Sequence, residues 1–202
     1  MQMPIGQSAE NPVAIRNEPD HKCCIENDYV YAYRVQLAPN QATLWHRHVE
    51  DTVYFSLAAT IGQEDFPAKE SIVTKIPCGA AVSRPHRHEP LVHKVTNLGA
   101  QQFHLIGAEA RAAPPLARTA AMLLPGHSLE LETDRFRVYR ITCSATISVD
   151  YRVCGLFVVC ANPDPDLSAN VGALVASDIR WVEGPLTIDI AAGFEGFFAE
   201  WR

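Results

Sequence analysis

Five of the eight histidines fall between His46 and His93, in two short stretches of the sequence. The first stretch, "TLWHRHVEDTVYF" (43–55), places His46 and His48 two residues apart and Asp51 three residues further on. The second stretch, "GAAVSRPHRHEPLVHKVTN" (79–97), contains three more histidines. Imidazole nitrogens and carboxylate oxygens are common ligands of divalent transition metals. We therefore expect side chains from both stretches to meet around one metal ion.

The elements that would position these side chains are short strands. Runs rich in Val, Ile, Tyr, Phe and Thr recur along the chain, and Pro, Gly and Asn separate them. Several runs alternate apolar and polar residues, which predicts an all-β sandwich or barrel. Because residues two apart on a strand share a face, "HRH" directs His46 and His48 to the same side.

After a tight turn, "DTVYFSL" is expected to resume as a strand. Asp51 would begin its inward face and so enter the interior beside the histidines, whereas Glu50 has the opposite parity and is the weaker candidate. An apolar wall for a small molecule is expected from five residues of the two stretches: Val53, Phe55, Leu57, Leu91 and Val95.

The two stretches resemble the paired motifs of the cupins. The second cupin motif reads G(x)5PxGxxH(x)3N, and Gly79, Pro85, His93 and Asn97 follow it, with three extra residues between the proline and the histidine. The first motif reads G(x)5HxH(x)3–4E. The form found here, "HRHVEDTVYF", is similar to that of small bacterial cupins with an HxHxxD variant.

The first motif departs from the family pattern at two positions. Asn40 takes the place of the family's glycine, and Asp51 lies nearer to the histidines than the usual Glu. In cupins the two motif strands face each other and bind one divalent metal. The resemblance therefore implies that His46, His48, Asp51 and His93 bind a transition metal, which is Fe, Mn, Ni, Zn or Cu.

The chain also repeats itself. "PDHKCCIENDYVYAYRV" (19–35) aligns without a gap on "PGHSLELETDRFRVYRI" (125–141), and His21 and His127 are among the identical pairs. The duplication implies a bicupin, two tandem jelly-roll (cupin, RmlC-like) β-barrels. The expected organisation is an N-terminal tail (1–15), a metal-binding cupin barrel (16–112) and a degenerate, metal-free cupin barrel (113–202).

The remaining histidines are weaker candidates. His86 and His88 lie in the extended "RPHRHEP" loop near the expected barrel mouth, either solvated or in contact with substrate. Together with His104 and Glu50, they are candidates for a proton-transfer group. His21 recurs in the half that lacks a metal motif, so we expect a structural role for it and not metal binding.

Three functions are compatible with this pattern. The first is a metal-dependent enzyme acting on a small organic molecule, most simply a non-haem dioxygenase-type oxidoreductase, as resemblance to metal-binding cupins implies. The second is a non-catalytic metal or small-molecule binding protein, such as a sensor. The third, a metal-free epimerase-like cupin with a histidine base, has no need of the HxHxxD cluster.

The composition limits the classes of partner that we expect for this protein. The net charge of −6 and the isoelectric point near 5.7 argue against a nucleic-acid partner, which needs a basic surface. The sequence contains no long apolar run of the kind that spans a membrane, and its start, "MQMPIGQSAENPV", lacks the pattern of a signal peptide. We therefore expect a cytoplasmic protein. Because jelly rolls expose sheet edges, we also expect a homodimer.

Overall fold

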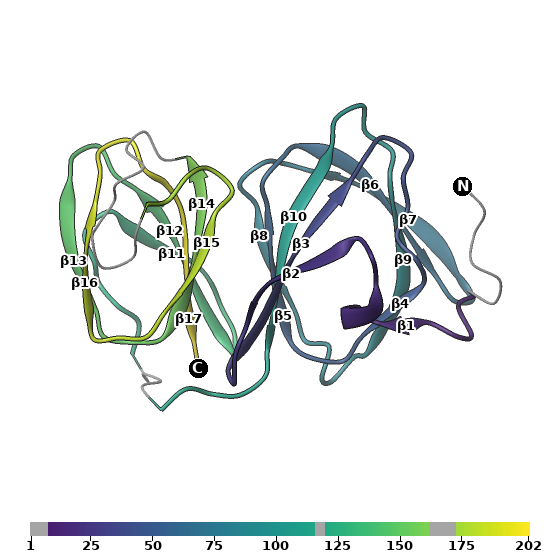
Figure 1. Ribbon diagram of the computed structural model, residues 1–202, viewed down its shortest axis with the longest axis horizontal. Coiled ribbons are helices and arrows are strands. Elements are labelled where there is room, and N and C mark those ends of the chain that lie inside the picture. Colours follow the sequence, from purple (N-terminus) through teal and green to yellow (C-terminus); the bar gives the residue numbers. More distant parts are fainter. Residues whose placement is uncertain (1–7, 116–119, 162–172) are drawn as a thin grey trace. The chain divides into compact units, whose positions relative to one another are not determined.

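The computed structural model describes residues 8–115, 120–161 and 173–202. These residues are almost entirely β-structure, and their helix is limited to one 3-10 turn, η1 (Ile15–Asn17) (Figure 1). The chain divides into two compact units. Unit 1 comprises the N-terminal residues up to Glu26 together with Val30–Glu109, and unit 2 comprises Asn27–Tyr29 and Ala110–Arg202. The expectation of an all-β fold is confirmed.

Unit 1 contains two five-stranded sheets. The first has the order β1-β4-β9-β6-β7, and the second has the order β2-β3-β10-β5-β8. Neighbouring strands that are far apart in sequence, such as β3 and β10, are typical of a jelly roll. The strands of unit 1 are β1 (Val13–Ala14), β2 (His21–Glu26), β3 (Val30–Leu37), β4 (His46–His48), β5 (Thr52–Ser56), β6 (Thr60–Phe66), β7 (Lys69–Ile76), β8 (Ala81–Arg84), β9 (Leu91–Asn97) and β10 (Phe103–Ala110).

Part of the expected N-terminal tail belongs to this fold. Val13 and Ala14 pair in parallel with His46 and Arg47 of β4, and Ile15 is buried in the core of unit 1. Val13 and Ile15 explain why this segment is not a tail, because apolar side chains gain free energy when they are removed from water. Residues 1–7 of the expected tail lie outside the described residues.

Unit 2 contains one five-stranded sheet, β11-β12-β17-β14-β15, and one two-stranded sheet, β13-β16. In both units the first long hairpin carries an irregularity at the same aligned place, between Cys23 and Ile25 in unit 1 and between Leu129 and Leu131 in unit 2. The strands of unit 2 are β11 (His127–Glu132), β12 (Phe136–Thr142), β13 (Ile147–Tyr151), β14 (Gly155–Ala161), β15 (Ile179–Val182), β16 (Leu186–Ile190) and β17 (Glu195–Trp201).

The two units differ in how their interiors are filled. In unit 2 a large apolar cluster, which includes Tyr151, Phe157 and Phe198, occupies the interior. In unit 1 the corresponding cluster around Tyr33 and Phe103 is smaller, and a cavity lies between the two sheets. The sheets remain separate in each unit and pack as layers, which is consistent with the expected jelly-roll fold.

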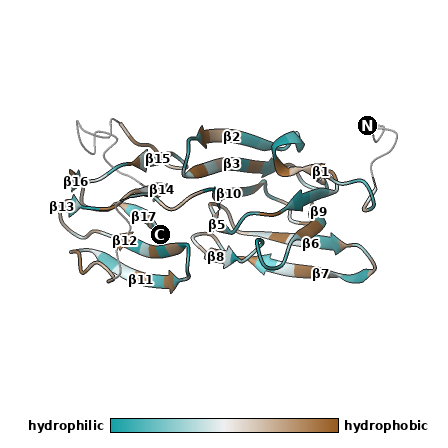
Figure 2. Ribbon diagram, turned by 90° about the horizontal axis from the view of Figure 1, so that it is seen from below, coloured by the Kyte–Doolittle hydropathy of each residue, from teal (hydrophilic) through white to brown (hydrophobic). Residues whose placement is uncertain are grey.

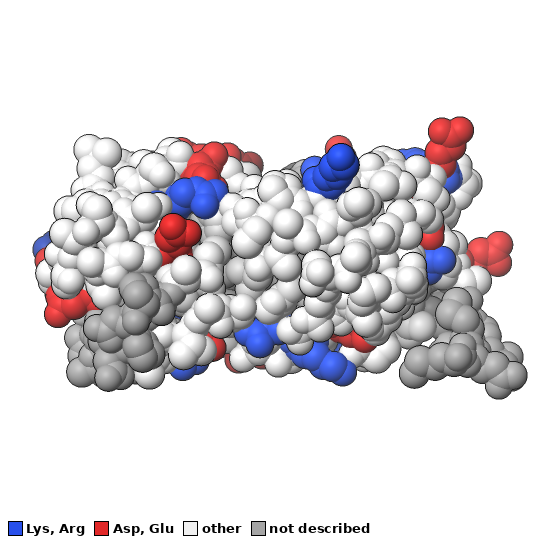
Figure 3. Space-filling view, turned by 90° about the horizontal axis from the view of Figure 1, so that it is seen from above, with Lys and Arg blue, Asp and Glu red and all other residues white. Residues whose placement is uncertain are grey.

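The surface carries charged side chains of both signs. Lys and Arg are scattered among Asp and Glu on the face shown in Figure 3, and outer strands such as β7 carry both hydrophilic and hydrophobic residues (Figure 2). Among the described residues, no helix has the length and apolarity needed to cross a bilayer.

Candidate metal centre

The pairing of β4 with β9 brings the two motifs together. His46 lies directly opposite His93 in this antiparallel pair, and their ring centroids are 4.5 Å apart. The ring of His48 lies 5.0 Å from that of His46 and 5.1 Å from that of His93. All three imidazoles are buried. The structure therefore brings together the three histidines that the sequence singled out.

A fourth imidazole joins them from outside the motifs. His21, on β2, has its ring 4.7 Å from that of His46 and 6.4 Å from that of His48. Each of these three histidines offers one ring nitrogen, and the three nitrogens lie within 4.8 Å of one another, a grouping able to hold a metal ion. The structure thus places His21 in the cluster, a position that its recurrence in unit 2 did not predict.

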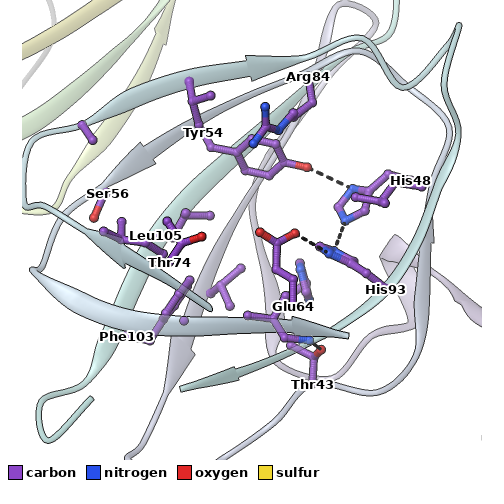
Figure 4. Close-up of a pocket in the computed structure, with 18 of the residues that line it drawn as sticks. Thr43, His48, Tyr54, Ser56, Glu64, Thr74, Arg84, His93, Phe103 and Leu105 are labelled. Carbon is purple, nitrogen blue, oxygen red and sulfur yellow. Dashed lines mark hydrogen bonds and ion pairs between the residues drawn. The ribbon is translucent and has the colours of Figure 1, made fainter. Parts of the chain in front are cut away.

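Two of the four imidazole rings contact a carboxylate through Nδ1, the nitrogen on the side away from the cluster. Nδ1 of His21 faces Oε2 of Glu18, and Nδ1 of His93 faces Oε2 of Glu64 at 3.1 Å (Figure 4). Because a carboxylate only accepts hydrogen bonds, each Nδ1 must carry the proton and donate it. Nε2 of each ring is then the nitrogen that is left to bind a metal. A carboxylate behind a metal-binding histidine is a common arrangement in metal sites.

The other two rings are also oriented through Nδ1. The ring of His46 donates from Nδ1 to the carbonyl oxygen of Leu44 at 2.9 Å. Nδ1 of His48 lies 3.3 Å from the hydroxyl of Tyr54, which also lies 3.1 Å from Nε2 of His86. Sequence reasoning missed Tyr54, Glu18 and Glu64 because no spacing rule connects them to the histidines.

Burial favours the neutral form of His46 and His48. Burial first, and then the neighbouring charges of His93 and His21, lower the pKa of His46 to about 2. Burial and the surrounding imidazoles also place the pKa of His48 well below its usual value. A neutral imidazole is the form that binds a metal. At neutral pH His46 and His48 therefore offer lone pairs, and no proton has to be displaced from these two rings.

Two observations test whether a metal fits among these residues. Nε2 of His46 is buried and has no hydrogen-bond partner among the described residues. Nε2 of His48 and Nε2 of His93 are 3.2 Å apart. Two nitrogens that bind one ion at about 2.0–2.1 Å lie about 2.8–3.0 Å apart at octahedral angles and about 3.3–3.4 Å apart at tetrahedral angles. The donor set therefore fits a divalent transition metal.

The two acidic residues of the first motif contact the loop after β8. Oδ1 of Asp51 accepts a hydrogen bond from the backbone N–H of Arg87 at 3.0 Å, and Glu50 pairs with the Arg87 guanidinium. Neither acid is among the described residues that line the cavity. Both anchor the loop that carries His86.

The remaining predicted residues lie at different distances from the cluster. His86 is buried, lines the cavity and stacks on His48 with ring centroids 4.9 Å apart. His88 is exposed, and its backbone N–H donates to the carbonyl oxygen of Pro85 at 3.0 Å. His104 is half-buried on β10, between two residues that line the cavity, Phe103 and Leu105.

The imidazole cluster borders a cavity of about 330 Å³ between the two sheets (Figure 4). Leu91 and Val95 line it as expected, but on β5 the lining residues are Tyr54 and Ser56. The expected wall of Val53, Phe55 and Leu57 is therefore wrong. Val53 and Phe55 are fully buried on the other face of β5. Because β5 is buried on both faces, apolarity does not identify the face that borders the cavity.

Unit 2 has apolar residues at the positions of the cluster. In the β13–β16 pair, Val149 lies opposite Ile188 and Tyr151 lies opposite Leu186. Alignment of "PLTIDIAA" with "PLVHKVTN" makes Val149 and Ile188 the counterparts of the directly opposed pair in unit 1. His127 remains, and its Nε2 lies 2.6 Å from the hydroxyl of Tyr151.

Comparison with known proteins gave matches among solved structures. No family model matches the sequence, and no curated protein matches it. A salicylate 1,2-dioxygenase from Pseudaminobacter salicylatoxidans aligns over 86% of this chain and 71% of its own length, with 12% identity and a TM-score of 0.56. The protein YhaK from Escherichia coli aligns over 93% of this chain and 95% of its own length, with 11% identity and a TM-score of 0.56.

A cupin domain from Bordetella pertussis aligns over 46% of this chain and 92% of its own length, with 25% identity and a TM-score of 0.42. At the identities of the two longer matches, similarity of structure establishes the fold and not the activity. The strand order, the paired motif strands and the two longer matches together show that this chain has the jelly-roll fold of the cupins.

Proposed function

We propose that this protein is a metal-dependent enzyme of the dioxygenase type that acts on a small organic molecule. The observation that carries the proposal is the buried imidazole cluster beside a cavity. The neighbouring structures include salicylate 1,2-dioxygenase, which has also been solved with gentisate. That relative binds a small organic molecule in the same fold, which supports a similar class of ligand here.

The proposed ligands are Nε2 of His46, His48 and His93, with one further ligand. The cupin motif favours Asp51 for this further position, whereas the geometry favours His21, whose ring lies in the cluster. A bound Fe, Mn, Ni, Zn or Cu ion would supply a Lewis acid with open positions for substrate oxygen atoms and for dioxygen.

The chain's own residues would prepare the site for this chemistry. Glu18 and Glu64 hold the Nδ1 protons of their histidines, so both rings keep one orientation. Phe103 and Leu105 add an apolar wall to the cavity, against which the body of a substrate packs. Tyr54 and His86 hold a proton between the hydroxyl and Nε2, close enough to the cluster to move it to or from a substrate.

Metal analysis of the purified protein tests the proposal. His46→Ala is expected to abolish bound metal and activity, because it removes the Nε2 that has no other partner. His88→Ala is the matched control, since His88 is exposed and lies outside the lining of the cavity. Full metal occupancy in His46→Ala would refute the assignment.

The further ligand is decided by a second pair of variants. If His21 binds the metal, His21→Ala lowers metal affinity and Asp51→Asn leaves it within about twofold of wild type; if Asp51 binds it, the order reverses. Oxygen uptake is then measured with panels of diketones, thiols and aromatic diols. Bound metal without turnover of any compound would favour the non-catalytic binding protein or sensor.

We also propose that unit 2 is a second cupin jelly roll without a metal site. The aligned strand irregularities and the aligned sequence segments support the duplication. Val149 and Ile188 lack metal-binding atoms, and the apolar cluster fills the space that is a cavity in unit 1. The expected result is one metal ion per chain, measured by elemental analysis.

A further inference from the structure

The charges around the cavity are unequal. Among the described residues that line it, Glu64 is the one carboxylate, and it is committed to Nδ1 of His93. Two cationic residues, Arg84 and Lys75, belong to the lining. Lys75 follows Thr74 on β7, so strand alternation turns its side chain to the face opposite that of Thr74. Arg84 is therefore the cation that matters for a molecule in the cavity.

Arg84 faces the cavity at its exposed mouth. In the β5–β8 pair, Arg84 lies opposite Thr52 and Val82 lies opposite Tyr54, so Arg84 shares a sheet face with Tyr54 (Figure 4). It forms no ion pair with any residue that the structure describes. The pKa of Glu64 is lowered first by the hydrogen bond from His93, and the charge of Arg84 contributes to the same shift.

The remainder of the wall is mainly apolar. Val35, Phe103 and Leu105 come from the sheet that contains β5 and β8, and Val95 comes from the opposite sheet. A guanidinium pairs with a carboxylate through two parallel hydrogen bonds, a geometry that a hydroxyl or an amide does not match. An unpaired guanidinium at the mouth, an apolar wall and a metal-binding cluster would together select a molecule with one charged end and one apolar body.

We propose that the cavity binds a small organic carboxylate, with its charged group on Arg84 and its apolar body against Phe103 and Leu105. The inference rests on the proposed function, because it concerns the same cavity. The volume of about 330 Å³ lies at the lower end of the range for small-molecule sites and accommodates a single-ring acid.

The test compares benzoate with benzamide, which has the same shape without the charge. Binding is measured by calorimetry on metal-free His46→Ala protein, so that a carboxylate cannot be held by a metal ion. We expect benzoate to bind at least about tenfold more tightly than benzamide. Arg84→Gln should abolish this preference. Lys69→Gln removes the same charge from β7 away from the cavity and should retain it.

Three outcomes would overturn the inference: equal affinity for benzoate and benzamide, no measurable binding of either, or an unchanged preference in Arg84→Gln. If His46→Ala does not fold, chelator-treated wild-type protein replaces it in every arm. Because all arms are free of metal, failure of this inference is separate from failure of the proposed function. A purified protein without metal would refute the metal-dependent enzyme and leave the benzoate result to stand by itself.

Discussion

The hydroxyl of Tyr54 lies between two imidazoles, and it has one proton to donate. If Nε2 of His48 binds a metal, the proton of that ring is on Nδ1 and is donated to the Tyr54 oxygen. The hydroxyl then donates to Nε2 of His86, so all three groups are satisfied. Without a metal, Nε2 of His48 can instead donate to Nε2 of His93 across 3.2 Å. Tyr54 therefore favours the metal-binding tautomer of His48.

Removal of this hydroxyl should weaken metal binding. We expect Tyr54→Phe to lower metal affinity by about 10-fold, the lower end of what is typical for groups that orient a metal-binding histidine. A competition titration with a chelating dye measures the affinity. Tyr31→Phe, on β3, is the matched control and should keep wild-type affinity. Equal affinities in Tyr54→Phe and wild type would show that the hydroxyl does not orient His48.

The metal-free protein should lose stability as the pH falls below about 6.5. Burial and neighbouring charges lower the pKa of His46 to about 2, and burial is the main cause that lowers the pKa of His86 to about 4. Both pKa values are below the unfolded value of 6.5, so unfolding takes up protons in acid. The stabilisation is complete above 6.5 and decreases toward the folded pKa values.

Each proton taken up on unfolding lowers the free energy of unfolding by about 1.4 kcal/mol per pH unit. Urea unfolding at pH 7.5, 6.0 and 5.0 measures the slope of the metal-free protein. His86→Phe removes one of the titrating groups and should flatten the slope. A wild-type free energy of unfolding that is constant over this range would contradict the prediction.

At the scale of the strands, the sequence predicted which histidines lie close together better than it predicted which face of a strand borders the cavity. The spacing of "HRH" places His46 and His48 on one face because strand side chains alternate, and the second motif places His93 on the strand that pairs with β4. His21 could not be predicted in the same way, since β2 reaches the cluster only through the arrangement of the two sheets.

The face of β5 that borders the cavity could not be predicted from the sequence, for a related reason. A strand that is buried on both faces gives no polar face to mark the outside, so Val53 and Tyr54 are equally acceptable as inward residues. Glu64 shows a similar limit, because its contact with His93 depends on the pairing of β6 with β9. Local alternation was predictable, whereas the partner strand and the buried face were not.

Close packing between β3 and β10 supports the position of His21. A Cβ atom at Gly107 would lie 2.4 Å from Cζ of Tyr33, and the Tyr33 ring lies 4.8 Å from that of His21. We expect Gly107→Ala to reduce stability by about 1–3 kcal/mol, as is usual for overpacking a core. It should also lower metal affinity if His21 is a ligand, because Tyr33 must move.

Chemical denaturation measures the first effect, and metal titration measures the second. Gly62→Ala provides a comparison, because its Cβ atom would come no nearer than 3.3 Å, to the flexible end of Ile76. It should cost less stability than Gly107→Ala. A Gly107→Ala protein as stable as wild type would show that Tyr33 relaxes without cost.

At the scale of the whole molecule, the two units differ in what fills their interiors. Unit 2 packs Tyr151, Phe157 and Phe198 into its interior and gains the stability of apolar burial. Unit 1 retains buried imidazoles, whose desolvation is unfavourable unless a ligand uses their lone pairs. A bound metal therefore contributes stability to unit 1 in particular.

Hydrogen exchange followed by mass spectrometry should locate this stabilisation. With Zn(II) at about 100 times its dissociation constant, metal binding contributes about 2.7 kcal/mol to the state that binds it. We expect slower exchange in the paired strands β4 and β9, which carry three of the proposed ligands, and unchanged exchange in β13 and β16 of unit 2. Unit 2 is the internal control, and His46→Ala should show no response. Equal protection of both strand pairs would place the metal elsewhere, because Val149 and Ile188 offer no ligand atoms to hold it.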